Sequence, residues 1–379
     1  MENKPVKKRE ANLELLRIVA MLMVITLHYL GKGGGLIYYE YFQNDVAPIP
    51  NIVLAWFLEA VCYGATNIYV LISGYFLVSS NFRMEKGIKL WIQIFFYSAG
   101  IFLLFLLLGK VPAEMNGIFW LAMYLTPSAS QHYWFGSVYL LMYMFSPFLA
   151  LISRKLGKKQ LLGLIVCCML VFSTLWTDIL PFTHPIDDAG MGIAWFSTLF
   201  FIAAYIRLYV PTVKRKWILP IIFFACAILM TISVIGFGWF ASKTGHMQNR
   251  QGMAYDYNSI LVTVESIVIF LFFREIKIKD GFFAKAVCAV SGLTFGIYLC
   301  HENMLLRDLW KSFWNVPFHF SKGYFIVHLI VTVFVVFIAG AIVEFIRKTI
   351  FDLIYKIPFI KKIFVFVSKA DSLFPNKEQ

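Results

Sequence analysis

Residues 12–35 read NLELLRIVAMLMVITLHYLGKGGG, an apolar run that carries Arg17 and His28. The two residues stand eleven positions apart. At about 100° per residue, eleven steps make roughly three helical turns, so a helix would present both side chains on one face, about 16 Å apart along its axis. Ionisable groups inside a bilayer are costly and usually mark a functional site. The stretch therefore predicts a first membrane helix that carries part of a site.

The composition of the 379-residue chain is that of an integral membrane protein. Hydrophobic residues make up 60% of the chain and charged residues only 15%, whereas soluble domains carry about 25% charged residues. The net charge is +13, but the basic residues lie in short segments between apolar runs, which indicates membrane topology rather than nucleic-acid binding. We expect one integral domain in the lipid bilayer, with no nucleic-acid partner.

Ten segments are long and apolar enough to cross a bilayer as helices. Their expected cores are residues 12–31, 52–79, 88–108, 133–153, 161–177, 191–210, 217–239, 257–273, 285–306 and 323–347. The stretch 116–127 is apolar but short, which is typical of a re-entrant or interfacial segment. We therefore expect an all-α, polytopic membrane protein of about ten transmembrane helices.

Lysine and arginine residues are distributed unevenly between the two sides of these helices. The segments on one side contain 26 of them, the loops on the other side contain seven, and Arg17 lies within the first helix. The positive-inside rule then predicts that both the N- and C-termini are cytoplasmic. It divides the chain into a basic cytoplasmic tail (1–11), a membrane domain of ten helices (12–347) and a cytoplasmic, amphipathic basic tail (348–379).

The polar residues in and beside the expected helices also differ in the side of the membrane toward which they fall. Arg17 and Arg83 fall near the cytoplasmic face, and the residues toward the outer face are His28, His132, His301 and Glu302. Arginine suits phosphate, and histidine exchanges protons near neutral pH. This distribution predicts a phosphorylated ligand that enters from inside, with proton transfer further out. A packing role for each histidine and a snorkelling role for Arg17 remain alternatives.

Other polar features favour structural roles. Glu59, Glu265 and Glu344 lie in or near spans, where we expect ion pairing or protonation. The six cysteines lie in apolar segments without a CxxC pair, so we expect packing residues, no disulfide framework and no metal site. The acidic outer loop 178–190 is either a solvated loop or a lip that binds an acceptor or a metal. Residues 33–35 form a predicted flexible turn outside the membrane.

Four motifs occur in order along the predicted helices. They are Arg17 and His28 as Arg-x10-His, Ile72-Ser73-Gly74-Tyr75, His132-Tyr133-Trp134-Phe135, and Thr294-Phe295-Gly296-Ile297-Tyr298-Leu299-Cys300-His301. Together they resemble the acyltransferase 3 family of bacterial membrane acyltransferases, over nearly the whole chain. Tyr75 replaces the commoner phenylalanine after Ser-Gly.

The resemblance implies an enzyme, an O-acyltransferase of the bacterial cytoplasmic (inner) membrane. Relatives commonly move acetyl from acetyl-CoA onto extracytoplasmic carbohydrate. The expected donor is therefore acetyl-CoA or another acyl-CoA, without a bound cofactor, and the expected acceptor is a surface polysaccharide or its lipid-linked precursor, with glycan-assembly proteins as candidate partners. The catalytic candidates are His28, Arg17 and His301, and the substrate-binding candidates are Arg83, Ser73, His132, Trp134, Tyr298 and Glu302.

A transporter or flippase of a glycan precursor is the alternative function. In such a protein the intramembrane arginine, histidine and glutamate residues would form a proton relay. Transporters often contain inverted repeats and paired broken helices, and the sequence shows no internal symmetry of that kind. The sequence therefore favours the acyltransferase.

Overall fold

The computed structural model describes residues 9–32, 36, 47–115, 117–130, 132–179, 188–246 and 251–377. The predicted flexible turn at 33–35, most of the basic N-terminal tail and most of the outer loop 178–190 lie outside these ranges. Every regular element within them is a helix, which confirms the all-α prediction.

Eight helical segments in the described ranges are long and apolar enough to cross a membrane. They are α1 (Ala11–Leu27) with its continuation to Gly31, α3 (Ile49–Tyr63) with α4 (Ala65–Leu77), α5 (Met84–Leu107), α7 (Trp134–Lys155), α10 (Ile218–Thr244), Met253–Tyr255 with α11 (Ile260–Arg274), α12 (Phe282–Ser291) with α13 (Thr294–His301), and α16 (Phe325–Ile354). The other two expected spans are shorter helices, α8 (Lys158–Met169), which continues as a π-helix over Leu170–Ile179, and α9 (Ile193–Tyr209). The chain is a multi-pass membrane protein.

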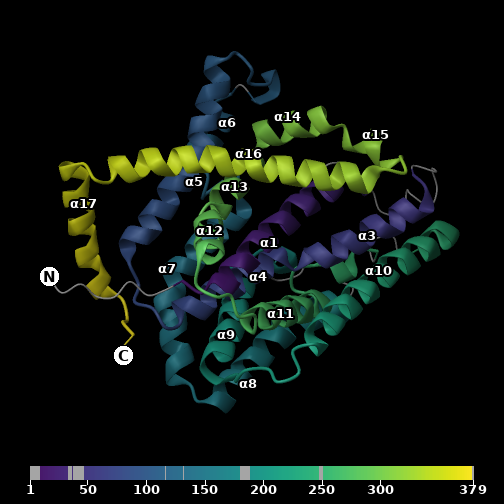
Figure 1. The fold of residues 1–379 in the computed structure, drawn as a ribbon, viewed down its shortest axis with the longest axis horizontal. Coiled ribbons are helices and arrows are strands. Elements are labelled where there is room, and N and C mark those ends of the chain that lie inside the picture. Colours follow the sequence, from purple (N-terminus) through teal and green to yellow (C-terminus); the bar gives the residue numbers. More distant parts are fainter. Residues whose placement is uncertain are drawn as a thin grey trace.

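Helix α1 passes through the middle of the bundle (Figure 1) and packs against α3, α4, α11, α12, α13 and α16. Helix α9 is likewise buried along most of its length. In contrast, α10 and α16 expose large apolar side chains along one face, such as Ile232 and Phe345. Apolar side chains are stable on such a face only when it contacts lipid, so α10 and α16 lie at the periphery of the bundle.

Two of the expected spans are each interrupted between two helices. Helices α3 and α4 meet at Gly64, where an added Cβ would lie 2.7 Å from Ser266 Oγ on α11. Helices α12 and α13 are separated at Gly292 and Leu293. Because Gly64 has no side chain, the α3–α4 junction approaches α11 more closely than any other residue would allow.

The start of α1 and the C-terminal tail lie at the same end of the bundle. Glu10 pairs with Arg207 at the end of α9, across 3.5 Å. Tyr209 donates a hydrogen bond to the Leu156 carbonyl just after α7, and Arg154 on α7 donates one to the Asn376 carbonyl. The side of the membrane that this end faces remains a prediction.

Short helices lie at the edge of the bundle (Figure 1). Helix α6 (Ile118–Leu125), within the apolar stretch 116–127, exposes Ile118 and Phe119. Helices α14 (Met304–Trp314) and α15 (Val316–Phe320) follow α13. Helix α17 (Pro358–Ser368) has no buried residue and turns sharply away from the end of α16 (Figure 1).

Candidate active site

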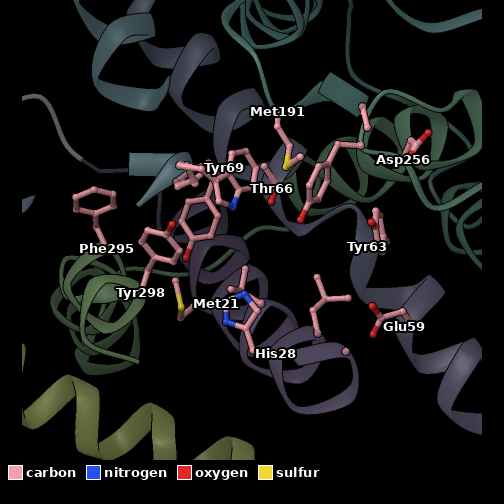
Figure 2. A pocket seen from close by; sticks show the side chains of 17 residues that line it. Met21, His28, Glu59, Tyr63, Thr66, Tyr69, Met191, Asp256, Phe295 and Tyr298 are labelled. Atoms are coloured by element: carbon pink, nitrogen blue, oxygen red, sulfur yellow. The ribbon is translucent and has the colours of Figure 1, made fainter. Parts of the chain in front are cut away.

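A cavity of about 440 Å³ lies between α1, α3, α4, α7 and α13 (Figure 2). Its lining consists of Met21, Val24, Leu27, His28, Gly31, Glu59, Tyr63, Thr66, Tyr69, Trp134, Phe135, Ala189, Met191, Asp256, Tyr257, Phe295 and Tyr298. Most of these side chains are apolar or aromatic, and a few carry polar groups, which is the usual composition of a small-molecule site. The cavity brings together three of the predicted site residues, His28, Trp134 and Tyr298.

His28 stands where α1 changes from an α-helix to a π-helical turn, His28–Lys32. The helix is regular up to Leu27, and the apolar segment that precedes His28 is buried almost completely. A π-helical turn widens the helix and redirects the side chains that it carries, and such turns are frequent at functional sites. The local change of helix type therefore presents His28 to the cavity.

His28 forms a hydrogen-bonded pair with His301 at the end of α13. His28 Nδ1 lies 2.9 Å from His301 Nε2, and His301 Nδ1 lies 2.7 Å from the Ile297 carbonyl oxygen. A carbonyl oxygen only accepts, so His301 carries its proton on Nδ1 and accepts at Nε2. His28 therefore donates from Nδ1, and its lone pair is on Nε2.

Glu302 reinforces this arrangement. Its Oε2 lies 3.1 Å from His28 Nδ1, and its Oε1 lies 3.1 Å from Arg307 Nη1 on α14. The Glu302 side chain is only 5% exposed. A buried carboxylate beside Nδ1 stabilises the cation that forms when Nε2 takes a proton.

Aromatic rings form much of the cavity wall. Tyr63 stacks on Tyr257 with ring centroids 5.1 Å apart, and Tyr257 lies 5.4 Å from Trp134. On the other side, Tyr298 contacts Phe135 edge to face. The Tyr298 hydroxyl is buried and makes no hydrogen bond within the described residues.

Arg17 does not line the cavity but lies close to it. Met21, which follows Arg17 by four residues, does line the cavity. Four residues are about one helical turn, so Arg17 is one turn away from the lining. The Arg17 guanidinium lies 3.4 Å from Glu14 Oε2. Tyr69, another lining residue, donates a hydrogen bond to the Arg17 carbonyl.

Three other predicted site residues lie outside the cavity lining. Ser73 hydrogen-bonds to the Tyr69 carbonyl and to the Tyr139 hydroxyl. The Arg83 side chain is 55% exposed at the start of α5 and pairs with Glu85. His132, just before α7, packs edge to face against aromatic rings, and burial lowers its pKa from 6.5 to about 4. The substrate-binding roles predicted for these residues stay predictions.

Sequence reasoning did not select several residues that line the cavity. Glu59, for which the sequence predicts ion pairing or protonation, lies in the cavity wall (Figure 2). Its position within an apolar span was the available signal. Asp256, Tyr257 and Tyr63 carried no comparable signal, because their place in the wall depends on how separate helices pack.

The remaining acidic side chains and the cysteines are placed elsewhere. Glu344 on α16 accepts hydrogen bonds from Arg347, Tyr97 and Gln93. Glu265 is fully buried on α11, beside Gly64. All six cysteines are free, and the described residues contain no group of histidine, cysteine and acidic side chains that could hold a metal ion.

Comparison with known proteins gives one match. The model of the acyltransferase 3 family, described as an acyltransferase domain, matches residues 10–346. No curated protein and no solved structure matches the chain.

Proposed function

Because the chain belongs to the acyltransferase 3 family, it is a membrane acyltransferase, and we propose that it moves acetyl from cytoplasmic acetyl-CoA to a hydroxyl group of an extracytoplasmic polysaccharide or its lipid-linked precursor. In this proposal the protein lies in the cytoplasmic membrane of a bacterium. Its start and its C-terminal tail, which share one end of the bundle, face the cytoplasm, and His28 lies toward the other face.

One observation carries the proposal. The Nδ1 atom of His28 lies 3.1 Å from the buried Glu302 carboxylate, and the same imidazole borders the cavity. An imidazole held in this way is an effective general base, because its lone pair is on Nε2 and its cation is stabilised. General bases of this kind typically contribute about 10²–10⁴-fold to a rate.

In the proposed reaction, His28 is the general base. His28 Nε2 takes the proton of the acceptor hydroxyl as its oxygen attacks the thioester carbonyl. The carbon–sulfur bond of the acyl-CoA breaks, an ester carbon–oxygen bond forms, and the imidazolium returns the proton to the departing thiolate. We propose that the hydroxyl of Tyr298, a residue of the cavity wall, donates a hydrogen bond to the oxyanion.

The charge at the inner end of α1 suits the donor. Arg9 and Arg17 both contact the single carboxylate of Glu14. Two guanidinium groups on one carboxylate leave a net positive charge, which attracts the phosphate groups of acyl-CoA. The donor would thus bind with its phosphates near Arg17 and its thioester toward His28.

Labelled acetyl-CoA and inverted membrane vesicles test the proposal. Vesicles with the wild-type protein should transfer label to glycan, and His28→Ala and His28→Gln should each reduce this transfer at least about 10²-fold. His246→Gln, which changes an exposed histidine at the end of α10, is the matched control. Glycan labelling by the His28 variants at the wild-type rate would refute the role of His28. Movement of a glycan precursor across the membrane without any label transfer would favour the transporter.

A further inference from the structure

A second cleft, of about 930 Å³, lies between the start of α1 and the neighbouring helix α12 (Figure 1). Its lining consists of residues 9–12, residues 276–281 between α11 and α12, and Ala284, Lys285 and Cys288 on α12. Positions 281, 284, 285 and 288 share one face of a helix, so the cleft follows α12 for about 10 Å. Among the described residues it shares no lining residue with the cavity at His28, and the proposed chemistry does not use it.

The lining of this cleft is predominantly basic. Its ionisable side chains other than Cys288 are the basic Arg9, Lys277, Lys279 and Lys285 and the acidic Glu10 and Asp280. Arg9 pairs with Glu14 across 2.8 Å, and Glu10 pairs with Arg207 across 3.5 Å. Each of these pairs neutralises one charge of the lining. The three lysines and Asp280 remain, so the cleft keeps an excess of positive charge.

The three lysines of the cleft have no counter-charge on the protein. Lys277, Lys279 and Lys285 are exposed and form no ion pair within the described residues. Like charges around one cleft repel one another, and a bound anion relieves that repulsion. The lysine ammonium group is a compact point charge that binds phosphate well. The cleft therefore suits a ligand that carries phosphate.

Two large apolar side chains stand directly beside these lysines. Phe282 and Phe283 follow Gly281 and are 90% and 59% exposed. They are also the first two residues of the candidate membrane span Phe282–His301. The end of a span lies at the boundary between hydrocarbon and water, where aromatic rings meet lipid and where the phosphate groups of lipids are found. The lysines are thus at the depth of lipid phosphates, next to rings that contact lipid chains.

We propose that this cleft binds the headgroup of an anionic phospholipid, with its phosphate among Lys277, Lys279 and Lys285 and its acyl chains against Phe282 and Phe283. Basic pockets between membrane helices are known to bind such headgroups. The lipid supplies the negative charge that the protein does not, whereas a zwitterionic headgroup would also bring an ammonium group among the lysines. This inference does not depend on the proposed acyl transfer.

Native mass spectrometry of the purified protein in detergent tests the site, with cardiolipin, phosphatidylglycerol and phosphatidylcholine as probes. The first anionic lipid bound should have a dissociation constant at least about 10-fold below that of phosphatidylcholine. Each lysine close to anionic lipid contributes about fivefold in affinity. Combining Lys277→Gln, Lys279→Gln and Lys285→Gln in one protein should therefore weaken binding of the anionic lipid at least about 10-fold.

A matched control removes the same charge elsewhere at this end of the bundle. Lys155→Gln, Lys158→Gln and Lys159→Gln change exposed residues beside the junction of α7 and α8, and together they should leave the affinity within about twofold of wild type. Arginine in place of all three cleft lysines keeps the charge and should retain lipid binding. This second variant distinguishes a loss of charge from a loss of fold.

Coenzyme A distinguishes a lipid from a soluble source of phosphate, because it carries phosphate groups without lipid chains. It should leave the anionic lipid bound to the wild-type protein. Displacement of the lipid by coenzyme A would assign the cleft to a nucleotide and overturn the proposal. Equal affinities for phosphatidylcholine and the anionic lipids, or equal losses in the two triple glutamine variants, would overturn it as well.

Discussion

Replacing Glu302 with glutamine tests the proposed role of the carboxylate beside His28. The side chain keeps its shape and loses its charge. A full charge 3.1 Å from His28 Nδ1, at an effective dielectric constant of about 20, stabilises an imidazolium by about 5 kcal/mol. Arg307, 3.1 Å from the other carboxylate oxygen, opposes part of this effect. We therefore expect a loss of about 3–4 kcal/mol of transition-state stabilisation, which is a fall in kcat of about 10²–10³-fold.

The assay is steady-state acyl transfer by purified protein, with kcat and KM for acetyl-CoA measured separately. Glu302 contacts the base rather than the donor, so kcat should fall and the KM for acetyl-CoA should change little. Asp308→Asn makes the same change of charge at an exposed residue on α14 and should retain wild-type kcat. A Glu302→Gln variant that folds normally and keeps a kcat within about twofold of wild type would refute the reasoning.

Two further predictions concern stability, measured by thermal unfolding in detergent. An alanine at Gly296 would place its Cβ against the Glu344 carboxyl group, so Gly296→Ala should cost about 3 kcal/mol. Gly236→Ala, where no atom lies within 4 Å of the added Cβ, should be neutral or stabilise by up to about 1 kcal/mol; equal effects of the two changes would contradict the close contact. For His132, burial lowers the pKa from 6.5 to about 4, so the unfolded chain binds a proton first as the pH falls. Stability should decline between these two pH values by up to about 3 kcal/mol, and His132→Phe should remove that part of the decline; an unchanged pH dependence would show that His132 is not responsible.

The class of fold follows from the sequence because the bilayer imposes it. Long apolar runs can satisfy their backbone groups in lipid only as helices, so the spans at 88–108, 217–239 and 323–347 could be located from hydropathy. Hydropathy does not show where a span is interrupted. The division of the expected second helix at Gly64 depends on the approach of Ser266 from a helix about 200 residues later in the chain.

The candidate site likewise has a part that the sequence predicts and a part that depends on tertiary structure. Arg17 and His28 stood out in the sequence because ionisable side chains are rare in an apolar helix. Nothing in the sequence shows that His28 Nδ1 meets both His301 and Glu302, since these residues are 273 and 274 positions later in the chain.

Residues 12–35 show both what the local sequence determines and what the packing of helices determines. Their apolar run and eleven-residue spacing are local properties, and they suffice to predict a helix with a charged inner end and a histidine further along. The cavity beside His28 arises only when α3, α4 and α13 pack against α1 and α7 packs against α4. Side chains such as Glu59 and Tyr257 acquire a place in one wall through that packing, because their proximity depends on contacts between helices that are distant in sequence.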